Sequence, residues 1–566
     1  MHRRSNAAKS LTHRTEVTRA VVPGHGDVRR IRPVGDAALT VELGDTIDPV
    51  LNARVRSLDE RLHADPPPGL VETVPTFRSL LVLYDPDRTS FAAMAAAVSR
   101  SVPSLAEVST PPGRRHVVPT RYGGEDGPDL PAVASRCGLS EARVVELHTG
   151  RDYVAFMLGF TPGFAYLGLT PEALDMPRLA TPRLRIAAGS VGVAGRQTAI
   201  YPSASPGGWN LIGRTSARPF DPHREPPALI LPGDAVRFAA VPELDEVQPV
   251  SSPVPTPERP AIRVMEAGLL STVQDVRRIG LRRLGVSGGG AADVRALARA
   301  NAAVGNAPDA AGIECTVSGP ALAFLAGARF AVAGADLGAV LERADLGAWP
   351  VPTEVAVRAR PGNVLRFEAR LSGCRAYVAV AGGIDVPAVL GSRSTDMAAG
   401  IGGIGGRPLR AGDVLGACAG GAVTPAMRPP EAHRPSGVAT VRVVMGPQDR
   451  LFEAAARERF LSVTWGVAAG SDRVGCRLDG PPVRPEGPAE IVSDGMVPGC
   501  VQVAADGRPM VMLADGPTTG GYPKIATVIS ADVGRVAQLV PGEGRVRFAA
   551  VTVEEAQRVG KGSPSR

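Results

Sequence analysis

The sequence predicts a mostly β protein of several domains, with repeated β-rich units that each close into a barrel. Its 566 residues include 66 glycines and 53 prolines but only 4% aromatic residues, a composition that favours short strands and tight turns. One turn-and-strand phrase also recurs along the chain. Because 566 residues are too many for one core, we expect about three to five domains.

The recurring phrase is a Pro-Gly turn followed by alternating apolar residues, at 232–238, 361–367 and 541–548. Proline and glycine form the turn, and the alternation predicts a strand with one buried face. Gly207-Gly208-Trp209 precedes one of these turns by about the same interval as Gly520-Gly521-Tyr522 precedes another. The two phrases together predict duplicated barrels, although turn-and-strand phrases also arise independently in β proteins.

Breaks in composition divide the chain. Residues 248–260 are rich in proline and lack apolar periodicity, which predicts a stiff, extended linker between two independently folding halves. A second, weaker break covers 419–437. With an arm at 1–28 and a tail at 553–566, the breaks leave blocks at 29–112, 113–247, 261–418 and 438–552. Helical patterns occur at 129–136, at 140–149 with Ser140 as N-cap, and at 293–304.

The positive charge lies at the two ends of the chain. The formal net charge is +7, but residues 1–25 carry a net +4 and residues 556–566 a net +3, so the body between them is neutral. We expect residues 1–28 to be a disordered basic arm. A neutral body lacks the basic stripe that nucleic-acid binding requires, so we expect no nucleic-acid partner.

No apolar run reaches the length of a signal peptide or a membrane span, so we expect a cytoplasmic protein without membrane contact. The six cysteines are dispersed, which argues against both a zinc site and a disulfide framework. We therefore expect no metal site.

Lysine is almost absent: three lysines stand against sixty arginines, and only Lys524 lies inside a patterned segment. Arginine replaces lysine wherever a surface needs only solvated charge, so this bias indicates that position 524 needs a compact ammonium. The alternative is an ordinary surface lysine. We expect Lys524 and the preceding Asp515 to be catalytic.

Three stretches combine glycine, aromatic and polar residues as binding sites do. The first, 156–167, contains Phe160 and Phe164 and predicts either an apolar pocket wall or a tight core turn. The second, 195–215, offers amide, hydroxyl and guanidinium groups for a planar substrate with a carboxylate, or is an ordinary polar loop. The third surrounds Lys524. The candidate substrate-binding residues are Phe160, Phe164, Gln197, Tyr201, Gly207, Gly208, Trp209, Asn210, Thr518, Thr519, Gly520, Gly521 and Tyr522, with Arg214 as a further catalytic candidate.

Several familiar motifs are missing. The chain has no phosphate-binding Gly-x-x-x-x-Gly-Lys-Ser/Thr sequence and no Met-Lys-Met site for covalent biotin. Gly285-Val286-Ser287-Gly288-Gly289 fits a nucleophile elbow, but a flexible turn before the helix at 293 is the better interpretation. Nucleotide or biotin chemistry must therefore use an unfamiliar site or one shared with another chain.

At this level of detail the chain resembles a known family. The N-terminal half is similar to the B component of bacterial 5-oxoprolinase, also described as the Kip inhibitor or allophanate hydrolase subunit 1 family. Residues 261–550 are similar to the C component, the Kip antagonist or allophanate hydrolase subunit 2 family. The phrases that carry the resemblance are 35–39, 74–80, 122–130, 160–167 and 207–215 in the first half, and 268–275, 381–386, 391–396, 471–473 and 518–527 in the second.

The resemblance implies a natural B–C fusion with an α+β N-terminal part and tandem cyclophilin-like β-barrels. It also implies ATP-dependent opening of 5-oxo-L-proline to L-glutamate with a separate protein, the A component of 5-oxoprolinase, which is of the LamB/YcsF-like family. We expect a homo-oligomer. In that scheme phosphorylation turns the lactam oxygen into a leaving group, Arg214 pairs with the substrate carboxylate and Lys524 neutralises developing charge. Asn210, Gln197 and Thr519 orient the ring amide. The ATP site and any Mg²⁺ requirement stay open.

Two other functions fit the same resemblance. The carboxyltransferase region of urea carboxylase is similar to B and C joined, which implies biotin-dependent carboxyl transfer to urea or a related amide. The family's older names describe inhibition of a sensor kinase, which is a non-enzymatic binding function. Both enzymatic interpretations place the planar amide substrate between Trp209 and Tyr522, on loops from opposite sides of the linker.

Overall fold

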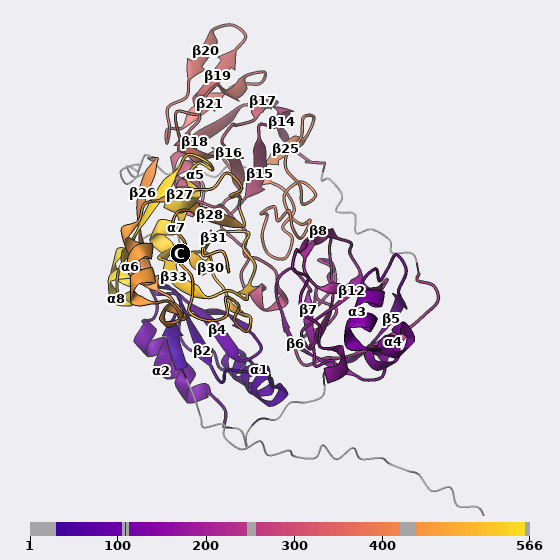
Figure 1. Ribbon diagram of the computed structural model, residues 1–566. Helices are drawn as coiled ribbons and strands as arrows, with labels where there is room; N and C mark the ends of the chain where they lie inside the picture. The colour runs from indigo at the N-terminus through magenta and orange to yellow at the C-terminus, as the bar shows by residue number, and fades with distance from the viewer. Residues whose placement is uncertain (1–29, 105–107, 109–112, 246–255, 419–436, 561–566) are drawn as a thin grey trace, which may run out of the picture.

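The computed structural model describes residues 30–104, 108, 113–245, 256–418 and 437–560. The predictions for 1–28, for most of the linker at 248–260 and for nearly all of 419–437 lie outside these ranges. Within them the protein is mostly β, as predicted, and contains two closed seven-stranded barrels (Figure 1).

The N-terminal part is an α+β unit with a four-stranded antiparallel sheet in the order β1-β2-β4-β3. Helices α1 and α2 pack on this sheet, and α1 begins where the carboxylate of Asp48 accepts bonds from the backbone N–H groups of Val50 and Leu51. The elements are β1 (Arg30–Pro33), β2 (Ala38–Glu42), α1 (Pro49–Ala64), β3 (Leu70–Pro75), β4 (Ser79–Tyr84) and α2 (Phe91–Ser101).

Barrel 1 follows, with strands in the closed order β10-β7-β6-β13-β5-β12-β9. The predicted helices are present as α3 and α4, and Ser140 caps α4 through the N–H of Arg143. The elements are β5 (Arg115–Tyr122), α3 (Leu130–Cys137), α4 (Glu141–Thr149), β6 (Tyr153–Leu158), β7 (Ala165–Gly168), η2 (Glu172–Leu174), β8 (Arg183–Ile186), β9 (Ser190–Ala194), β10 (Gln197–Ile200), β11 (Ser205–Gly207), β12 (Asn210–Arg214) and β13 (Ala235–Ala240).

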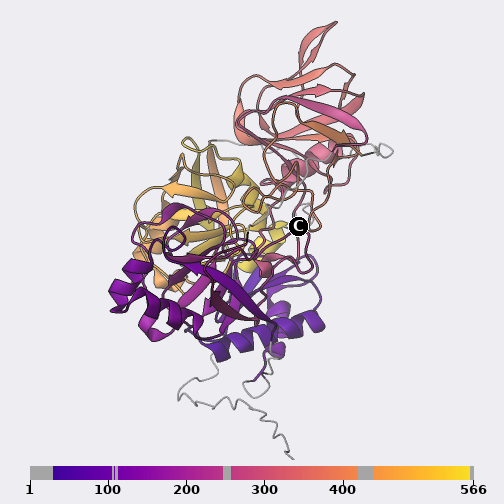
Figure 2. The same cartoon turned by 90° about the vertical axis from the view of Figure 1, so that its right-hand side faces the viewer.

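The next unit is a sandwich of two sheets, not the closed barrel expected for 261–418. The seven-stranded sheet has the order β20-β19-β22-β17-β14-β25-β24 and the five-stranded sheet the order β15-β16-β23-β18-β21. The elements are β14 (Pro260–Glu266), β15 (Leu270–Gln274), η3 (Arg282–Leu284), α5 (Val294–Val304), β16 (Gly312–Thr316), β17 (Ala321–Phe324), β18 (Ala328–Asp336), β19 (Ala339–Arg343), β20 (Gly347–Pro350), β21 (Val357–Ala359), β22 (Val364–Phe367), β23 (Ser372–Val380), β24 (Ile384–Asp385) and β25 (Val414–Ala417). The β19–β20 hairpin lies at the far end of this unit (Figure 2).

Barrel 2 closes in the order β26-β33-β30-β31-β28-β27-β34. Its elements are β26 (Val438–Met445), η4 (Asp449–Leu451), α6 (Ala454–Ser462), β27 (Trp465–Val467), β28 (Gly475–Asp479), β29 (Asp494–Gly495), β30 (Cys500–Val503), β31 (Pro509–Met512), β32 (Thr519–Gly520), β33 (Lys524–Val528), α7 (Ser530–Ala537), β34 (Arg545–Ala550) and α8 (Val553–Gly560). The tail expected from 553 therefore starts as a helix, because Val553 and Ala556 are buried against Ile529 and Val444.

The two barrels have the same topology. In each, the strand after the Pro-Gly turn pairs in parallel with the first strand, β13 with β5 and β34 with β26. Going round the barrels, β12, β9, β10, β7 and β6 correspond in order to β33, β30, β31, β28 and β27. The duplication predicted from the two phrases is confirmed for these two blocks.

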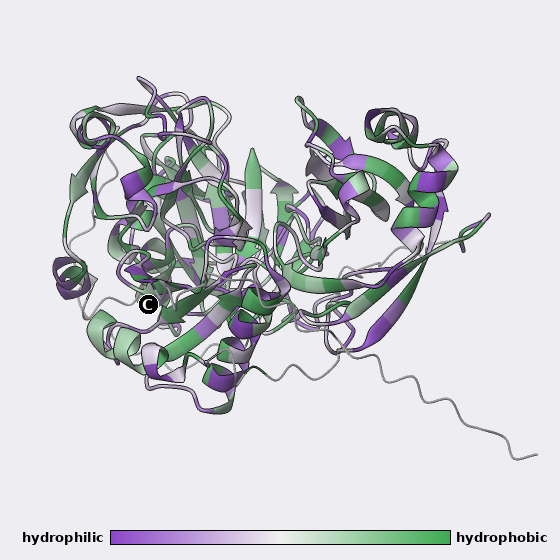
Figure 3. Cartoon of the chain, turned by 60° about the horizontal axis from the view of Figure 1, so that its bottom comes forward, coloured by the Kyte–Doolittle hydropathy of each residue, from purple (hydrophilic) through white to green (hydrophobic). Residues whose placement is uncertain are grey.

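The halves on either side of the linker pack closely together. The N-terminal sheet lies against barrel 2 (Figures 1 and 2), where Val74 and Leu81 pack with Met496, Cys500 and Met512. Glu72 and Arg282 form a buried ion pair of 3.0 Å across the same boundary. Figure 3 shows hydrophobic and hydrophilic residues mixed along the peripheral helices, as expected for helices with one buried face.

Candidate functional site where the two barrels meet

A short two-stranded ribbon accompanies each barrel and leads into one of the predicted binding loops. Ribbon 1 pairs β8 with β11 just before Trp209, and ribbon 2 pairs β29 with β32 just before Tyr522. Asn210 and Lys524 are then the first residues of the corresponding strands β12 and β33. The two loops singled out in the sequence thus occupy equivalent places in the two barrels.

The Trp209 loop is part of an aromatic cluster. Trp209 meets Phe164 and Tyr166 edge-on, with ring centroids 5.7 and 5.9 Å apart, and Phe164 meets Tyr201 at 5.3 Å. Phe164, Tyr201 and Trp209 are 2%, 1% and 6% exposed. These rings therefore pack against one another in a core. This agrees with the alternative interpretation of 156–167, a tight core turn, and not with an open pocket wall.

Phe160 lies at the edge of this cluster and is half-buried. Its φ of 64° falls in the left-handed region, which non-glycine residues seldom adopt. The turn 159–164, called here the junction turn, is held in this shape from outside barrel 1. The N–H of Phe160 donates to Thr519 Oγ1 at 3.3 Å, and the N–H of Gly163 donates to the carbonyl of Leu284.

Ribbon 2 and its approach therefore contact barrel 1 directly. A Cβ placed on Gly159 would overlap the hydroxyl of Thr519, and Val492 packs against the aromatic cluster. Burial raises the pKa of Tyr166 to about 12, although Arg178 and a side-chain hydrogen bond with Thr519 lower it in part. Phe160 and Thr519, two candidate site residues from opposite sides of the linker, are thus in direct contact.

Lys524 is fully buried beneath ribbon 2. Its ammonium donates to Asp494 Oδ2 at 2.9 Å and to the carbonyl of Gly495 at 3.2 Å. Neither side chain of the pair is exposed to solvent. Lys524 is therefore not the surface lysine of the alternative interpretation.

Asp494 is the residue on which this arrangement depends, and no motif in the sequence pointed to it. It also accepts bonds from Ser79 Oγ at 2.6 Å and Gln448 Nε2 at 3.2 Å. Burial pushes its pKa up, but Lys524 and Ser79 outweigh that effect and hold the pKa at about 2. Ser79 belongs to β4 of the N-terminal sheet, so its bond to Asp494 joins the two halves of the chain.

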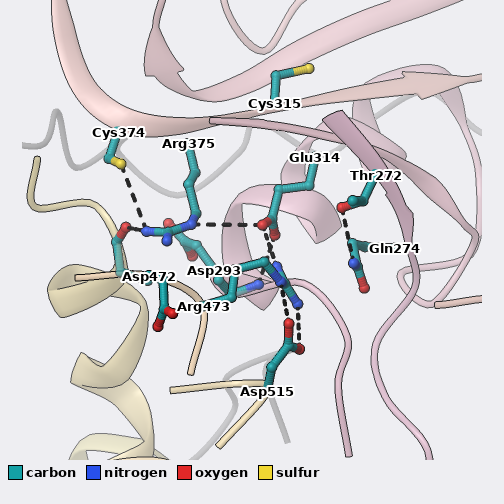
Figure 4. Close-up of polar contacts among 12 residues, drawn as sticks. Thr272, Gln274, Asp293, Glu314, Cys315, Cys374, Arg375, Asp472, Arg473 and Asp515 are labelled. Atoms are coloured by element: carbon teal, nitrogen blue, oxygen red, sulfur yellow. Dashed lines mark hydrogen bonds and ion pairs between the residues drawn. The ribbon is translucent and has the colours of Figure 1, made fainter. Parts of the chain in front are cut away.

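Asp515, predicted as a catalytic partner of Lys524, lies in a different network (Figure 4). Both of its oxygens accept from Arg473, at 2.8 and 2.9 Å, and the same guanidinium also bonds to Glu314 and to the carbonyl of Gly290. Burial raises the pKa of Asp515. For Glu314 burial acts in the same direction, but Arg473 and Arg375 outweigh it and lower the pKa.

The other predicted residues are dispersed. Arg214 is exposed at the opposite end of β12 from Asn210, and its Nε donates to the carbonyl of Ala188 at 3.3 Å. Asn210 is buried, with its amide donating to the carbonyl of Pro177 at 2.8 Å. The structure does not bring Arg214 to Lys524. Gln197 opens β10 and is half-buried, as are Gly207, Gly208, Gly520, Gly521 and Tyr522.

The loop at 285–290, called here the glycine loop, completes the region. Its Gly285 lies against the carbonyl of Thr161 and the N–H of Gly159, and its Gly289 lies beside the guanidinium of Arg278. Three buried polar atoms here have no hydrogen-bond partner among the described residues: Thr161 Oγ1, Thr518 Oγ1 and Arg278 Nη1. Buried groups are rarely left unpaired, so these atoms are candidates for binding a substrate.

Within the described ranges, no cluster of three or more His, Cys, Asp or Glu side chains is placed to hold a metal ion. The helices in those ranges are all too short or too polar to cross a membrane.

Two family models match the chain in tandem. "Carboxyltransferase domain, subdomain C and D" matches residues 29–230, and "Carboxyltransferase domain, subdomain A and B" matches residues 284–550.

Individual relatives match the two halves separately. The B subunit of 5-oxoprolinase from Escherichia coli O157:H7 is 45% identical over 206 residues, which cover 36% of this chain and 93% of that protein. The C subunit of 5-oxoprolinase from Escherichia coli strain K12 is 37% identical over 296 residues, which cover 52% of this chain and 93% of that protein. The urea amidolyase of Lachancea kluyveri is 31% identical over 323 residues, or 53% of this chain, but only 17% of that protein is covered.

A solved structure matches both halves at once. The crystal structure of TTHA0988 has a TM-score of 0.80 and 37% identity, covering 92% of this chain and all of that one.

Proposed function

Because this chain belongs to the carboxyltransferase-domain family and joins the regions of the 5-oxoprolinase B and C components, we propose that it is the fused B–C part of an ATP-dependent 5-oxoprolinase. It opens 5-oxo-L-proline to L-glutamate together with a separate A component. One observation carries the proposal: nearly complete counterparts of two proteins that bear this name follow one another in a single polypeptide.

The place where the two barrels meet suits such a substrate. 5-Oxoproline is a small flat lactam with one carboxylate, and the hydroxyls of Thr161 and Thr518 offer hydrogen bonds for the ring amide. The unpaired Nη1 of Arg278 offers a charged donor for the carboxylate. The catalytic roles of Lys524, Asp515 and Arg214 stay predictions, and the internal partners of Lys524 and Asp515 favour a positioning role for both.

The reaction needs activation because resonance stabilises an unstrained lactam. Transfer of the terminal phosphoryl group of ATP to the lactam oxygen releases ADP and makes the ring carbon electrophilic. Water then adds to that carbon, the C–N bond breaks as the nitrogen takes up protons, and a second water releases phosphate from the resulting acyl phosphate. The products are glutamate, ADP and phosphate.

The test is an assay of glutamate formation by the full chain with the A component, ATP and 5-oxoproline. We expect Thr518→Val to lower kcat/KM about tenfold, since a lost hydrogen bond is worth roughly 1–1.5 kcal/mol. Thr170→Val is the matched control, because Thr170 in barrel 1 also has a buried hydroxyl without a partner among the described residues but lies outside the barrel contact. If no glutamate forms in a manner that depends on both ATP and 5-oxoproline, the proposal is overturned and a binding function is favoured.

The similarity to urea amidolyase supports a second candidate, carboxyl transfer from biotin to urea or a related amide. The same purified chain is tested with a carboxybiotin carrier and urea. Carboxylation of urea without 5-oxoproline hydrolysis would replace the first proposal by the second.

A further inference from the structure

A well-formed cavity lies between the N-terminal sheet, the segment 276–299 and barrel 2. It has a volume of about 620 Å³ and is enclosed by the β1–β2 turn of the N-terminal sheet, the segment 276–299 and the β33–α7 part of barrel 2. Gly289 of the glycine loop lines one side of it. The cavity therefore borders the barrel contact through the glycine loop and is built from both halves of the chain.

The cavity wall carries more positive than negative charge. Six arginines line it: Arg277, Arg282, Arg295, Arg299, Arg442 and Arg535. Only three acids do, and each is held by an internal donor: Asp36 by Ser530 at 2.8 Å, Asp293 by Gln538 at 2.9 Å and Asp532 by Arg442 at 2.7 Å. The carboxylates are thus committed to the fold.

Several arginine donors stay available. Arg277 is exposed to the cavity and has no hydrogen bond or ion pair with any described residue. Nε of Arg535 is buried without a partner among those residues, and Arg299 uses its Nε for Glu354 at 2.7 Å. The protein around the cavity lowers the pKa of Arg277 by displacing water, and the neighbouring Arg282 lowers it further, while Glu72 and Asp85 offset this in part. An anion in the cavity would relieve this repulsion.

Apolar side chains also line the cavity, among them Leu83, Val276, Val497 and Pro498. A volume of 620 Å³ falls within the range of roughly 300–1,000 Å³ typical of small-molecule and cofactor sites. Helices α5 and α7 both begin at the cavity, but Asp293 and Asp36 already accept bonds from their first N–H groups, so the arginines supply the positive charge.

We propose that this cavity binds a nucleoside polyphosphate, with its phosphates on the arginines and its base against the apolar wall. Naming the ligand as the phosphoryl donor rests on the proposed function, whereas binding itself does not. A donor in this position lies across the glycine loop from the contact between the two barrels. Both halves of the chain are needed to form the site.

Binding is measured by calorimetry on the full chain, without the A component or 5-oxoproline, using ATP, pyrophosphate and inorganic phosphate as separate probes. We expect ATP to bind at least tenfold more tightly than inorganic phosphate, and Arg277→Gln to weaken ATP binding about tenfold. Arg263→Gln, which removes an exposed arginine of β14, leaves the affinity unchanged. Binding also weakens as salt rises, because the contacts are ionic.

Failure to bind ATP or pyrophosphate would overturn this inference, as would unchanged affinity in Arg277→Gln. Thermal unfolding of the same variants checks that the fold is intact, which we expect because Arg277 has no partner among the described residues. If ATP fails to bind while glutamate is still formed with the A component, the proposed function survives and only the site is wrong. If ATP binds but no glutamate forms, the nucleotide site survives and only the proposed function is wrong.

Discussion

At the scale of single residues, the scarcity of lysine pointed to a position where the ammonium is buried. Lys524 and Asp494 neutralise each other where neither side chain is exposed to solvent, and the ammonium is a compact charge whereas a guanidinium is wide and forked. Sequence reasoning found Lys524 but not Asp494, because the sequence Ser-Asp-Gly, 30 residues before Lys524, is also typical of ordinary turns. The fold alone brings Ser79 to the same carboxylate.

Asp494 makes stability depend on pH in acid. Its pKa is about 2 in the folded protein and about 3.8 in the unfolded chain, so the stabilisation is complete above pH 4 and is lost as the pH falls towards 2. We expect Asp494→Asn to lower the free energy of unfolding by roughly 3–5 kcal/mol at pH 7, since it leaves a buried ammonium uncompensated. Urea unfolding of wild type and variant from pH 7 to 2 checks this.

The difference between the two proteins should shrink only below about pH 4. Asp479→Asn, which removes an exposed carboxylate of barrel 2 from a surface ion pair, serves as the control and should change stability by less than about 1 kcal/mol. An Asp494→Asn variant as stable as wild type at pH 7 would show that the pair contributes nothing.

At the scale of elements, turn and capping residues correctly predicted several strands and a helix start. They did not predict which strands pair with one another. The Pro-Gly turns give strands β13, β22 and β34, and the capping pattern gives α4. The same phrase leads into a barrel for β13 and β34 but into an open sheet for β22, because strand partners are set by residues far along the chain. Helices α1, α2, α6, α7 and α8 were missed, because a composition rich in glycine and proline favoured strands.

The contact between the junction turn and ribbon 2 yields a prediction at this scale. Gly159 has an ordinary φ, yet a methyl group there would collide with Thr519. We expect Gly159→Ala to push ribbon 2 away from barrel 1, lowering kcat/KM for glutamate formation at least tenfold and stability by roughly 1–3 kcal/mol. Glutamate assays and denaturant unfolding measure both effects.

Gly470→Ala is the matched control, because a methyl group at Gly470 meets no other atom within 4 Å. Shortening the Thr519 side chain tests whether the collision is the cause. Gly159→Ala combined with Thr519→Ala should recover part of the stability that Gly159→Ala loses. If the double variant is less stable than the sum of the two single changes, the collision is not the reason.

At the scale of the whole molecule, the prediction of independently folding halves needs correction. The linker joins two parts whose buried contacts depend on each other, through Glu72 with Arg282, Ser79 with Asp494 and Tyr84 with Gln557. Composition locates a linker, but it carries no information about the surfaces that meet across it. The relatives named as separate B and C subunits of 5-oxoprolinase match these two parts.

The last prediction follows from this interface. A chain cut within the linker, with both fragments co-expressed, should still assemble, because the buried contacts and not the linker hold the parts together. Glu72→Gln should weaken that assembly about 100-fold or more, since removing one partner of a buried ion pair costs roughly 3–5 kcal/mol. Glu243→Gln, at an exposed site outside this interface, should leave it unchanged. Co-purification at falling protein concentration measures the affinity, and fragments that separate without any substitution would show that the linker is what holds the protein together.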